Sequence, residues 1–116
     1  MKEKIFINAR IIDPSQNMDE MGSLILDQNG KVKAIGNKVK KSDVNTSVEV
    51  VDVKGNVLIP GIVDMKAFVG EPGYEYKENF RTLSQAALAG GVTSITTMPN
   101  TKPIIDNVSM VDFIIR

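Results

Sequence analysis

The sequence predicts an α/β protein in which a small antiparallel β unit precedes the first elements of a parallel sheet. Up to about residue 59, short β-branched runs alternate with turn residues, which is typical of about five short strands. Beyond residue 60 the apolar residues change to a helical period, return to a β-branched run, and become helical again. Strand, helix, strand, helix is the pattern of a parallel sheet. We therefore expect two regions, 1–59 and 60–116.

The predicted β unit contains one hairpin that turn chemistry specifies directly. Asn29-Gly30 separates two apolar runs, and both residues tolerate the positive φ of a tight hairpin turn. Asp13-Pro14 starts another turn. The polar, lysine-rich stretch 37–47 is expected to be an exposed loop. The predicted strands are Lys4–Asp13, Leu24–Asp27, Lys31–Gly36, Val48–Val53 and Val57–Ile59.

The second region begins with a short apolar strand that leaves a tight turn at Pro60-Gly61. Strand residues two apart point the same way, so Asp64, Lys66 and Phe68 are expected on one side where this strand ends. The glycine- and proline-containing loop 70–73 follows. In α/β folds, a strand end followed by such a loop is the usual place for a functional site.

A helix is predicted from about Glu78 to Ala89, ended by Gly90-Gly91. A strand is predicted over Val92–Met98, and a second helix after Asp106 or Asn107. A complete eight-stranded barrel needs about 250 residues. Because two strand-helix units are present, we expect this chain to be the N-terminal piece of a longer protein.

Composition excludes several kinds of site. The 116 residues hold 14 basic and 14 acidic side chains, a balance that favours neither nucleic acid nor an anionic membrane as a partner. The absence of cysteine agrees with a cytoplasmic location. With no histidine and no cysteine, the chain cannot build the usual zinc ligand sets or a Ser-His or Cys-His nucleophile pair.

Four motifs resemble the start of a dihydroorotase, a family of the amidohydrolase superfamily. They are Pro60–Asp64, Glu71–Gly73, Ala86–Ser94 and Met98–Pro103, and the likeness extends over essentially the whole chain. The resemblance implies a (β/α)8 TIM barrel of the metal-dependent-hydrolase type beside a β-sandwich formed by both chain ends. Residues 1–59 would then belong to the sandwich, and residues 60–116 would form the first two βα units of the barrel.

The resemblance also implies a chemistry that this chain has lost in part. The family interconverts carbamoyl aspartate and dihydroorotate in pyrimidine biosynthesis, with zinc polarising the amide carbonyl and activating water. Its His-x-His metal ligands fall on Lys66 and Phe68, on either side of Ala67, and its substrate-binding arginine falls on Gly70. An ammonium repels a metal and a phenyl ring donates no lone pair. We therefore expect no catalytic residue, no metal ligand and no cofactor in this chain, and one substrate-contacting residue, Asn100.

Three functions stay open on these grounds. The favoured one is a catalytically inactive relative that acts as a structural partner of aspartate transcarbamoylase in a homo- or hetero-oligomer. The second is an active zinc-dependent cyclic amidohydrolase whose ligands lie beyond residue 116. The third is a module that holds a pyrimidine-like anion through Asn100 and Lys66. For the individual residues the simpler roles are structural: a strand-end carboxylate at Asp64, an exposed lysine at Lys66, a space-filling ring at Phe68 and a loop-structuring amide at Asn100.

Overall fold

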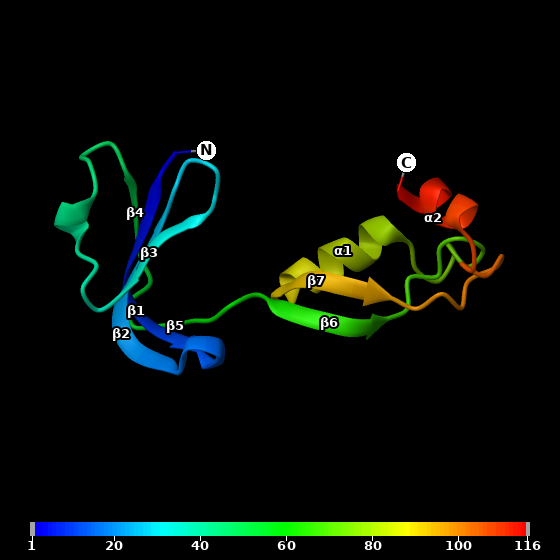
Figure 1. The fold of residues 1–116 in the computed structure, drawn as a ribbon, viewed down its shortest axis with the longest axis horizontal. Coiled ribbons are helices and arrows are strands. Elements are labelled where there is room, and N and C mark those ends of the chain that lie inside the picture. Colours follow the sequence, from blue (N-terminus) through cyan, green and yellow to red (C-terminus); the bar gives the residue numbers. More distant parts are fainter. Residues whose placement is uncertain (1, 116) are drawn as a thin grey trace. The chain divides into compact units, whose positions relative to one another are not determined.

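The protein divides into two compact units, with the division after Pro60. The computed structural model describes residues 2–115 (Figure 1).

The first unit is one five-stranded sheet. The strands run in the order β3-β2-β1-β4, and β5 pairs with the far part of β1. Short 3-10 turns follow β1 at Pro14–Gln16 and precede β4 at Lys41–Asp43. The strands are β1 (Lys4–Asp13), β2 (Met18–Leu26), β3 (Val32–Gly36), β4 (Glu49–Asp52) and β5 (Val57–Leu58) (Figure 1).

The expectation of an antiparallel unit is wrong for two of these strands. β1, β2 and β3 are antiparallel neighbours, but β4 and β5 both run parallel to β1, so the sheet is mixed. The reason lies in the connection 37–48 between β3 and β4. A parallel return needs a crossover of about a dozen residues, and this loop is long enough to bring the chain to the other side of β1. The β-sandwich expected from both chain ends stays a prediction, because residues 2–60 supply one sheet.

A bulge at Asn8 allows β1 to pair with both parallel strands. The β1–β2 register shifts between Phe6 and Ala9, and Asn8 has a φ of 57°. The part of β1 before Asn8 pairs with β4, and the part after it pairs with β5. The Asn8 amide donates to Asp52 Oδ1 at 3.0 Å. Asparagine suits this position because it tolerates the left-handed conformation better than most residues.

Alternate side chains of the central strands form the core of this unit. Ile5, Ile11 and Ile25 are almost completely buried. β2 and β3 form the hairpin that Asn29-Gly30 predicts. The alternating burial along the central strands and the turn between β2 and β3 are therefore consistent with one register of the sheet.

Asp13 closes the end of β1 with three hydrogen bonds. Its Oδ1 accepts from the Ser15 amide at 2.9 Å and the Ser15 hydroxyl at 2.6 Å, and its Oδ2 accepts from Gln16 at 2.6 Å. These donors stabilise the ionised carboxylate, so the pKa of Asp13 lies below its usual range.

We expect the Asp13 contacts to make the protein less stable in acid. Because the folded pKa lies below the unfolded value of about 3.9, their stabilisation is complete above that pH and is lost as pH falls through the folded pKa. Urea unfolding of the wild type and Asp13→Asn between about pH 7 and pH 2 measures this. The variant should lose less stability on acidification, and superimposable losses would contradict the prediction.

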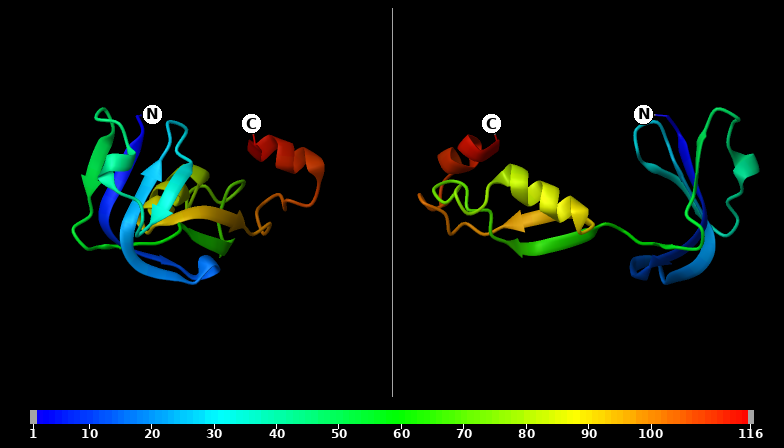
Figure 2. Two further views of the ribbon diagram at one scale, coloured as in Figure 1. Left: turned by 60° about the vertical axis from the view of Figure 1, so that its left-hand side comes forward. Right: turned by 180° about the vertical axis from the view of Figure 1, so that it is seen from behind.

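The second unit contains a parallel pair of strands joined by a helix. β6 (Ile62–Ala67) pairs with β7 (Val92–Thr97), and α1 (Phe80–Ala89) connects them. The right-hand view in Figure 2 shows α1 over one face of this pair. α2 (Val108–Ile115) follows β7. The α/β class and the strand-helix order are confirmed, whereas the eight-stranded barrel stays a prediction.

α1 begins two positions after the predicted start because Asn79 caps it. The Asn79 side chain accepts from the Thr82 amide at 3.0 Å, and Thr82 Oγ1 accepts from the Asn79 amide at 3.2 Å, which is a reciprocal capping box. The helix ends at Gly90-Gly91 as predicted, and Gly91 has a φ of +81°. Across residues 2–115, neither helix combines the length and apolar character that crossing a bilayer demands.

Candidate functional site

The candidate site lies at the carboxyl end of β6. The β6–β7 register advances three residues on β6 but two on β7 between Asp64 and Ala67, so β6 carries an extra residue there. Asp64 Oδ1 accepts the Lys66 amide at 2.9 Å across this irregularity. A bulge interrupts the strict alternation from which a common direction of Asp64, Lys66 and Phe68 was predicted. The Asp64 carboxylate therefore supports local backbone geometry, in agreement with its simpler role.

Lys66 and Phe68, at the positions where the resemblance implies metal ligands, are both exposed. The Phe68 ring lies 6.2 Å from the Tyr74 ring in a tilted arrangement, and Tyr74 lies 6.5 Å from Tyr76. The Lys77 ammonium is 5.4 Å from the centre of the Tyr74 ring and 5.6 Å from that of Tyr76. Both distances suit cation–π attraction. Phe68 is thus the first member of a group that we call the aromatic cluster. It consists of the rings of Phe68, Tyr74 and Tyr76 together with the Lys77 ammonium beside the two tyrosines.

Gly70 is enclosed by backbone on the loop that follows. It is buried, with a φ of +73°. A Cβ atom at this position would lie 2.6 Å from the Glu78 carbonyl oxygen and 3.0 Å from that of Tyr74. The Tyr74 amide donates to the Gly70 carbonyl at 2.6 Å, closing a tight turn. The position at which the resemblance implies an arginine therefore accepts no side chain in this backbone.

The loops after β6 and β7 are joined at Pro72 and Gly73. The Lys102 amide donates to the Pro72 carbonyl at 2.9 Å. A Cβ atom on Gly73 would collide with the Lys102 carbonyl oxygen, and Gly73 has a φ of +96°. The Gly73 amide donates to Glu75 Oε1 at 2.8 Å, and this bond lowers the pKa of Glu75. The Glu-Pro-Gly and Pro-Asn-Thr-Lys-Pro segments, remote in sequence, thus form one structure.

Asn100 lies in the loop after β7, and its side chain is exposed. Within residues 2–115 it makes no side-chain hydrogen bond. The neighbouring Thr101 is 4% exposed, and its hydroxyl donates to the Pro103 carbonyl at 2.8 Å. Thr101 therefore performs the loop-structuring role that the sequence suggested for Asn100. A polar residue between two prolines was the available indication. Substrate contact by Asn100 stays a prediction.

Glu71 connects the loop to the helix. Its Oε2 accepts the amide of Phe80, the first residue of α1, at 2.9 Å. The first amides of a helix lack partners within the helix, and a carboxylate there also interacts favourably with the helix dipole. The sequence pattern predicted a turn at Glu71 and did not indicate this contact, because the two residues are separated by the whole loop.

We expect Glu71→Ala to destabilise the protein by about 0.5–2 kcal/mol, the usual cost of a lost helix cap. Glu71→Gln should cost less because the amide oxygen still accepts. Urea unfolding followed by circular dichroism measures both changes. Glu75→Ala is the matched control, since Glu75 bonds Gly73 in the same loop. Equal losses in Glu71→Ala and Glu75→Ala would refute a specific capping role.

The residues at the site do not fit a metal ion. Among residues 2–115, no three His, Cys, Asp or Glu side chains lie close enough together to hold one. The two ligand positions present an ammonium and a phenyl ring, and the nearest carboxylate along the strand, Asp64, is engaged with the Lys66 amide.

A family model described as Dihydro-orotase-like matches residues 55–115. The chain belongs to this family. The match covers β5 and the whole sequence from β6 to α2, including both joined loops. Membership of the dihydroorotase family, predicted from the motifs, is confirmed.

Several relatives named dihydroorotase resemble this dihydroorotase-like chain over nearly its whole length. The protein of Syntrophus aciditrophicus is 47% identical over 108 residues, covering 93% of this chain and 25% of the relative. That of Pelobacter propionicus is 46% identical, with coverages of 93% and 24%. That of Aquifex aeolicus is 38% identical over 116 residues, with coverages of 100% and 26%. The dihydroorotase-like chain thus spans about a quarter of the length of the curated relatives it matches.

Family membership defines what is missing from this dihydroorotase-like chain. The family uses zinc, and residues 2–115 contain no cluster of three or more His, Cys, Asp or Glu side chains that could hold a metal ion. The aromatic cluster was not recognised from the sequence, because Tyr74 and Tyr76 do not belong to a helical or strand pattern. The only indication was the aromatic residue Phe68 at a position where the resemblance implies a metal ligand.

Proposed function

We propose that the protein is a catalytically inactive, dihydroorotase-like component of de novo pyrimidine biosynthesis that acts as a structural partner of aspartate transcarbamoylase. The main support is the environment of Gly70. The carbonyl of Glu78 occupies the space that a substrate-binding side chain would need. The backbone therefore leaves no room for a side chain at position 70, and Gly70→Arg alone would not create a substrate clamp.

The exposed chemistry of the loop also supports a role in protein contact. Tyr76 is 78% exposed and Phe68 is 39% exposed. Aromatic side chains are enriched in protein–protein interfaces and dominate their energetics. A structural partner can present this aromatic cluster to another protein.

Co-expression of the complete natural protein with aspartate transcarbamoylase from the same organism tests the proposal. We expect the two to copurify, and the transcarbamoylase assembly to change size when its partner is omitted. Tyr76→Ala should weaken the complex if the aromatic cluster belongs to the interface, with Lys38→Ala, on the first unit, as the control. Independent migration of both wild-type proteins in size-exclusion chromatography would overturn the partnership.

An active zinc-dependent dihydroorotase is the second candidate, favoured by the 47% identity to a protein named dihydroorotase. It would use metal ligands beyond residue 116. The sequence downstream of that residue is the first discriminating observation, followed by metal analysis and a dihydroorotate hydrolysis assay. Bound zinc with turnover would replace the first proposal, and metal-free protein without turnover would end the second.

A further inference from the structure

The β2–β3 turn holds the chain's one Asn-Gly sequence, Asn29-Gly30, on the surface of the first unit. Glycine has no Cβ atom to obstruct its own amide, so the Gly30 nitrogen can approach the side-chain carbonyl carbon of Asn29. We propose that Asn29 is a site of spontaneous deamidation, and that Asp27 suppresses the reaction in the folded protein.

The reaction needs water and no other reactant. The Gly30 nitrogen loses its proton and forms a bond to Asn29 Cγ, and the Cγ–Nδ2 bond then breaks. The side-chain nitrogen leaves as ammonia, and a five-membered succinimide remains. Water opens this ring at either carbonyl: attack at Cγ gives aspartate, and attack at the backbone carbonyl gives isoaspartate. No atom changes oxidation state, and one amide has been hydrolysed overall.

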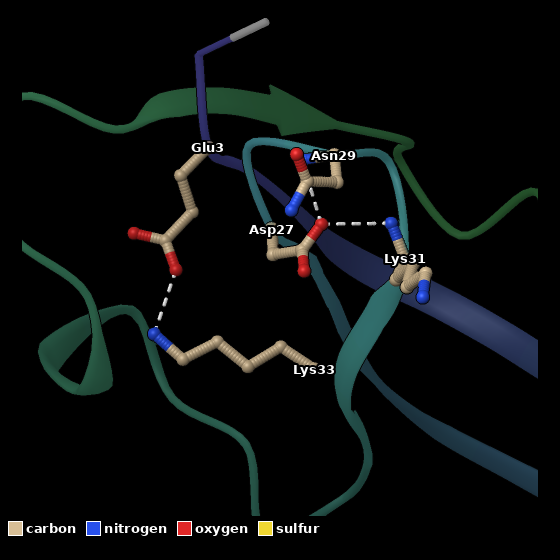
Figure 3. A network of polar contacts seen from close by, with 5 residues as sticks. All are labelled: Glu3, Asp27, Asn29, Lys31 and Lys33. Atoms are coloured by element: carbon tan, nitrogen blue, oxygen red, sulfur yellow. Dashed lines mark hydrogen bonds and ion pairs between the residues drawn. The ribbon is translucent and has the colours of Figure 1, made fainter.

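Asp27 holds the turn in a conformation that opposes this attack. Its Oδ1 accepts the amides of Asn29 at 2.8 Å and Lys31 at 2.9 Å, on both sides of Gly30 (Figure 3). Its backbone carbonyl accepts the Gly30 amide itself at 3.0 Å, and its amide donates to the Lys31 carbonyl at 2.8 Å. The attacking nitrogen must therefore give up its hydrogen bond while its neighbours are fixed by one carboxylate.

The Glu3–Lys33 pair seen beside this turn in Figure 3 does not contribute to the restraint. Lys33 Nζ donates to Glu3 Oε1 at 2.8 Å, and neither residue bonds Asn29 or Gly30. Asp27 is thus the side chain whose hydrogen bonds restrain the turn. Deamidation would place a second carboxylate next to it, and isoaspartate would add a methylene to the backbone between β2 and β3.

Removal of the Asp27 carboxylate should accelerate deamidation at position 29. The Asp27 carboxylate accepts two amides beside Gly30, and each factor of ten in rate corresponds to about 1.36 kcal/mol of barrier. We expect at least a tenfold increase, about 1.4 kcal/mol, in Asp27→Ala. Asp27→Asn, which retains an acceptor oxygen, should give an intermediate rate. The readout is peptide mapping by mass spectrometry with isoaspartate detection, after incubation of the full chain at neutral pH.

Two references separate local protection from general unfolding. The urea-unfolded wild type gives the unprotected rate, which should exceed the folded rate. Asp52→Ala is the matched control, because Asp52 Oδ1 also accepts a turn amide, that of Lys54 at 2.9 Å, away from Asn29. Its rate at position 29 should equal that of the wild type. Equal rates in folded and unfolded wild type, no acceleration in Asp27→Ala, or equal acceleration in Asp52→Ala would each overturn the proposal.

Discussion

Replacing Gly73 by alanine is expected to destabilise the protein by about 2–5 kcal/mol. The left-handed backbone at φ +96° costs an alanine about 1–2 kcal/mol. The collision between the new Cβ and the Lys102 carbonyl adds an overpacking cost of about 1–3 kcal/mol. The obstacle is backbone and not a flexible side chain, so relief requires the loops after β6 and β7 to separate.

Gly91→Ala is the matched control for this prediction. Gly91 lies in the same unit with a similar φ of +81°, but a Cβ atom at this position would have Ile62 Cδ1, at 4.0 Å, as its nearest neighbour. Alanine at position 91 should lower the free energy of unfolding only by the cost of its left-handed backbone conformation, about 1–2 kcal/mol. Urea unfolding gives both values, and hydrogen exchange at the Lys102 amide reports whether the loops have parted. Equal destabilisation by the two substitutions would show that the Lys102 contact contributes nothing.

Gly70→Arg is expected to damage the fold without recovering a substrate site. Its φ of +73° and the Glu78 carbonyl at 2.6 Å impose the same two costs, together about 2–5 kcal/mol. The arginine would enter only by reopening the turn that the Tyr74 amide closes on the Gly70 carbonyl. We therefore expect calorimetry to detect no gain in dihydroorotate binding.

Lys66→His provides the contrast to Gly70→Arg. Lys66 is exposed on β6, and surface substitutions usually change stability by less than about 0.5 kcal/mol. We therefore expect histidine at position 66 to leave the stability nearly unchanged and arginine at position 70 to lower it. A Gly70→Arg protein with wild-type stability that binds dihydroorotate would contradict both the enclosure of Gly70 by backbone and the inactive function.

Elements specified by neighbouring residues were predictable from the sequence. The Asn29-Gly30 hairpin, α1 and β7 lie close to their expected positions, because turn chemistry and hydrophobic period act within a few residues. β2 was predicted too short. Its first part, from Met18, has mostly polar or exposed side chains, and its pairing with the end of β1 supplies the strand. The directions of β4 and β5 were predicted wrongly for a related reason, since a strand's direction depends on where its connection returns.

At the candidate site, too, the chemistry of single residues was predictable from the sequence, whereas contacts between distant residues were not. The sequence by itself determined that Lys66, Phe68 and Gly70 offer an ammonium, a phenyl ring and no side chain, because donor chemistry is a property of the residue type. That they stand in place of two metal ligands and a substrate arginine stays a prediction from the family resemblance. Only the tertiary structure decided that Gly70 faces the Glu78 carbonyl, that Gly73 faces that of Lys102, and that Glu71 caps α1. These contacts join residues across loops. They depend on the path of the backbone in space, and that path is set by packing beyond the reach of any local pattern.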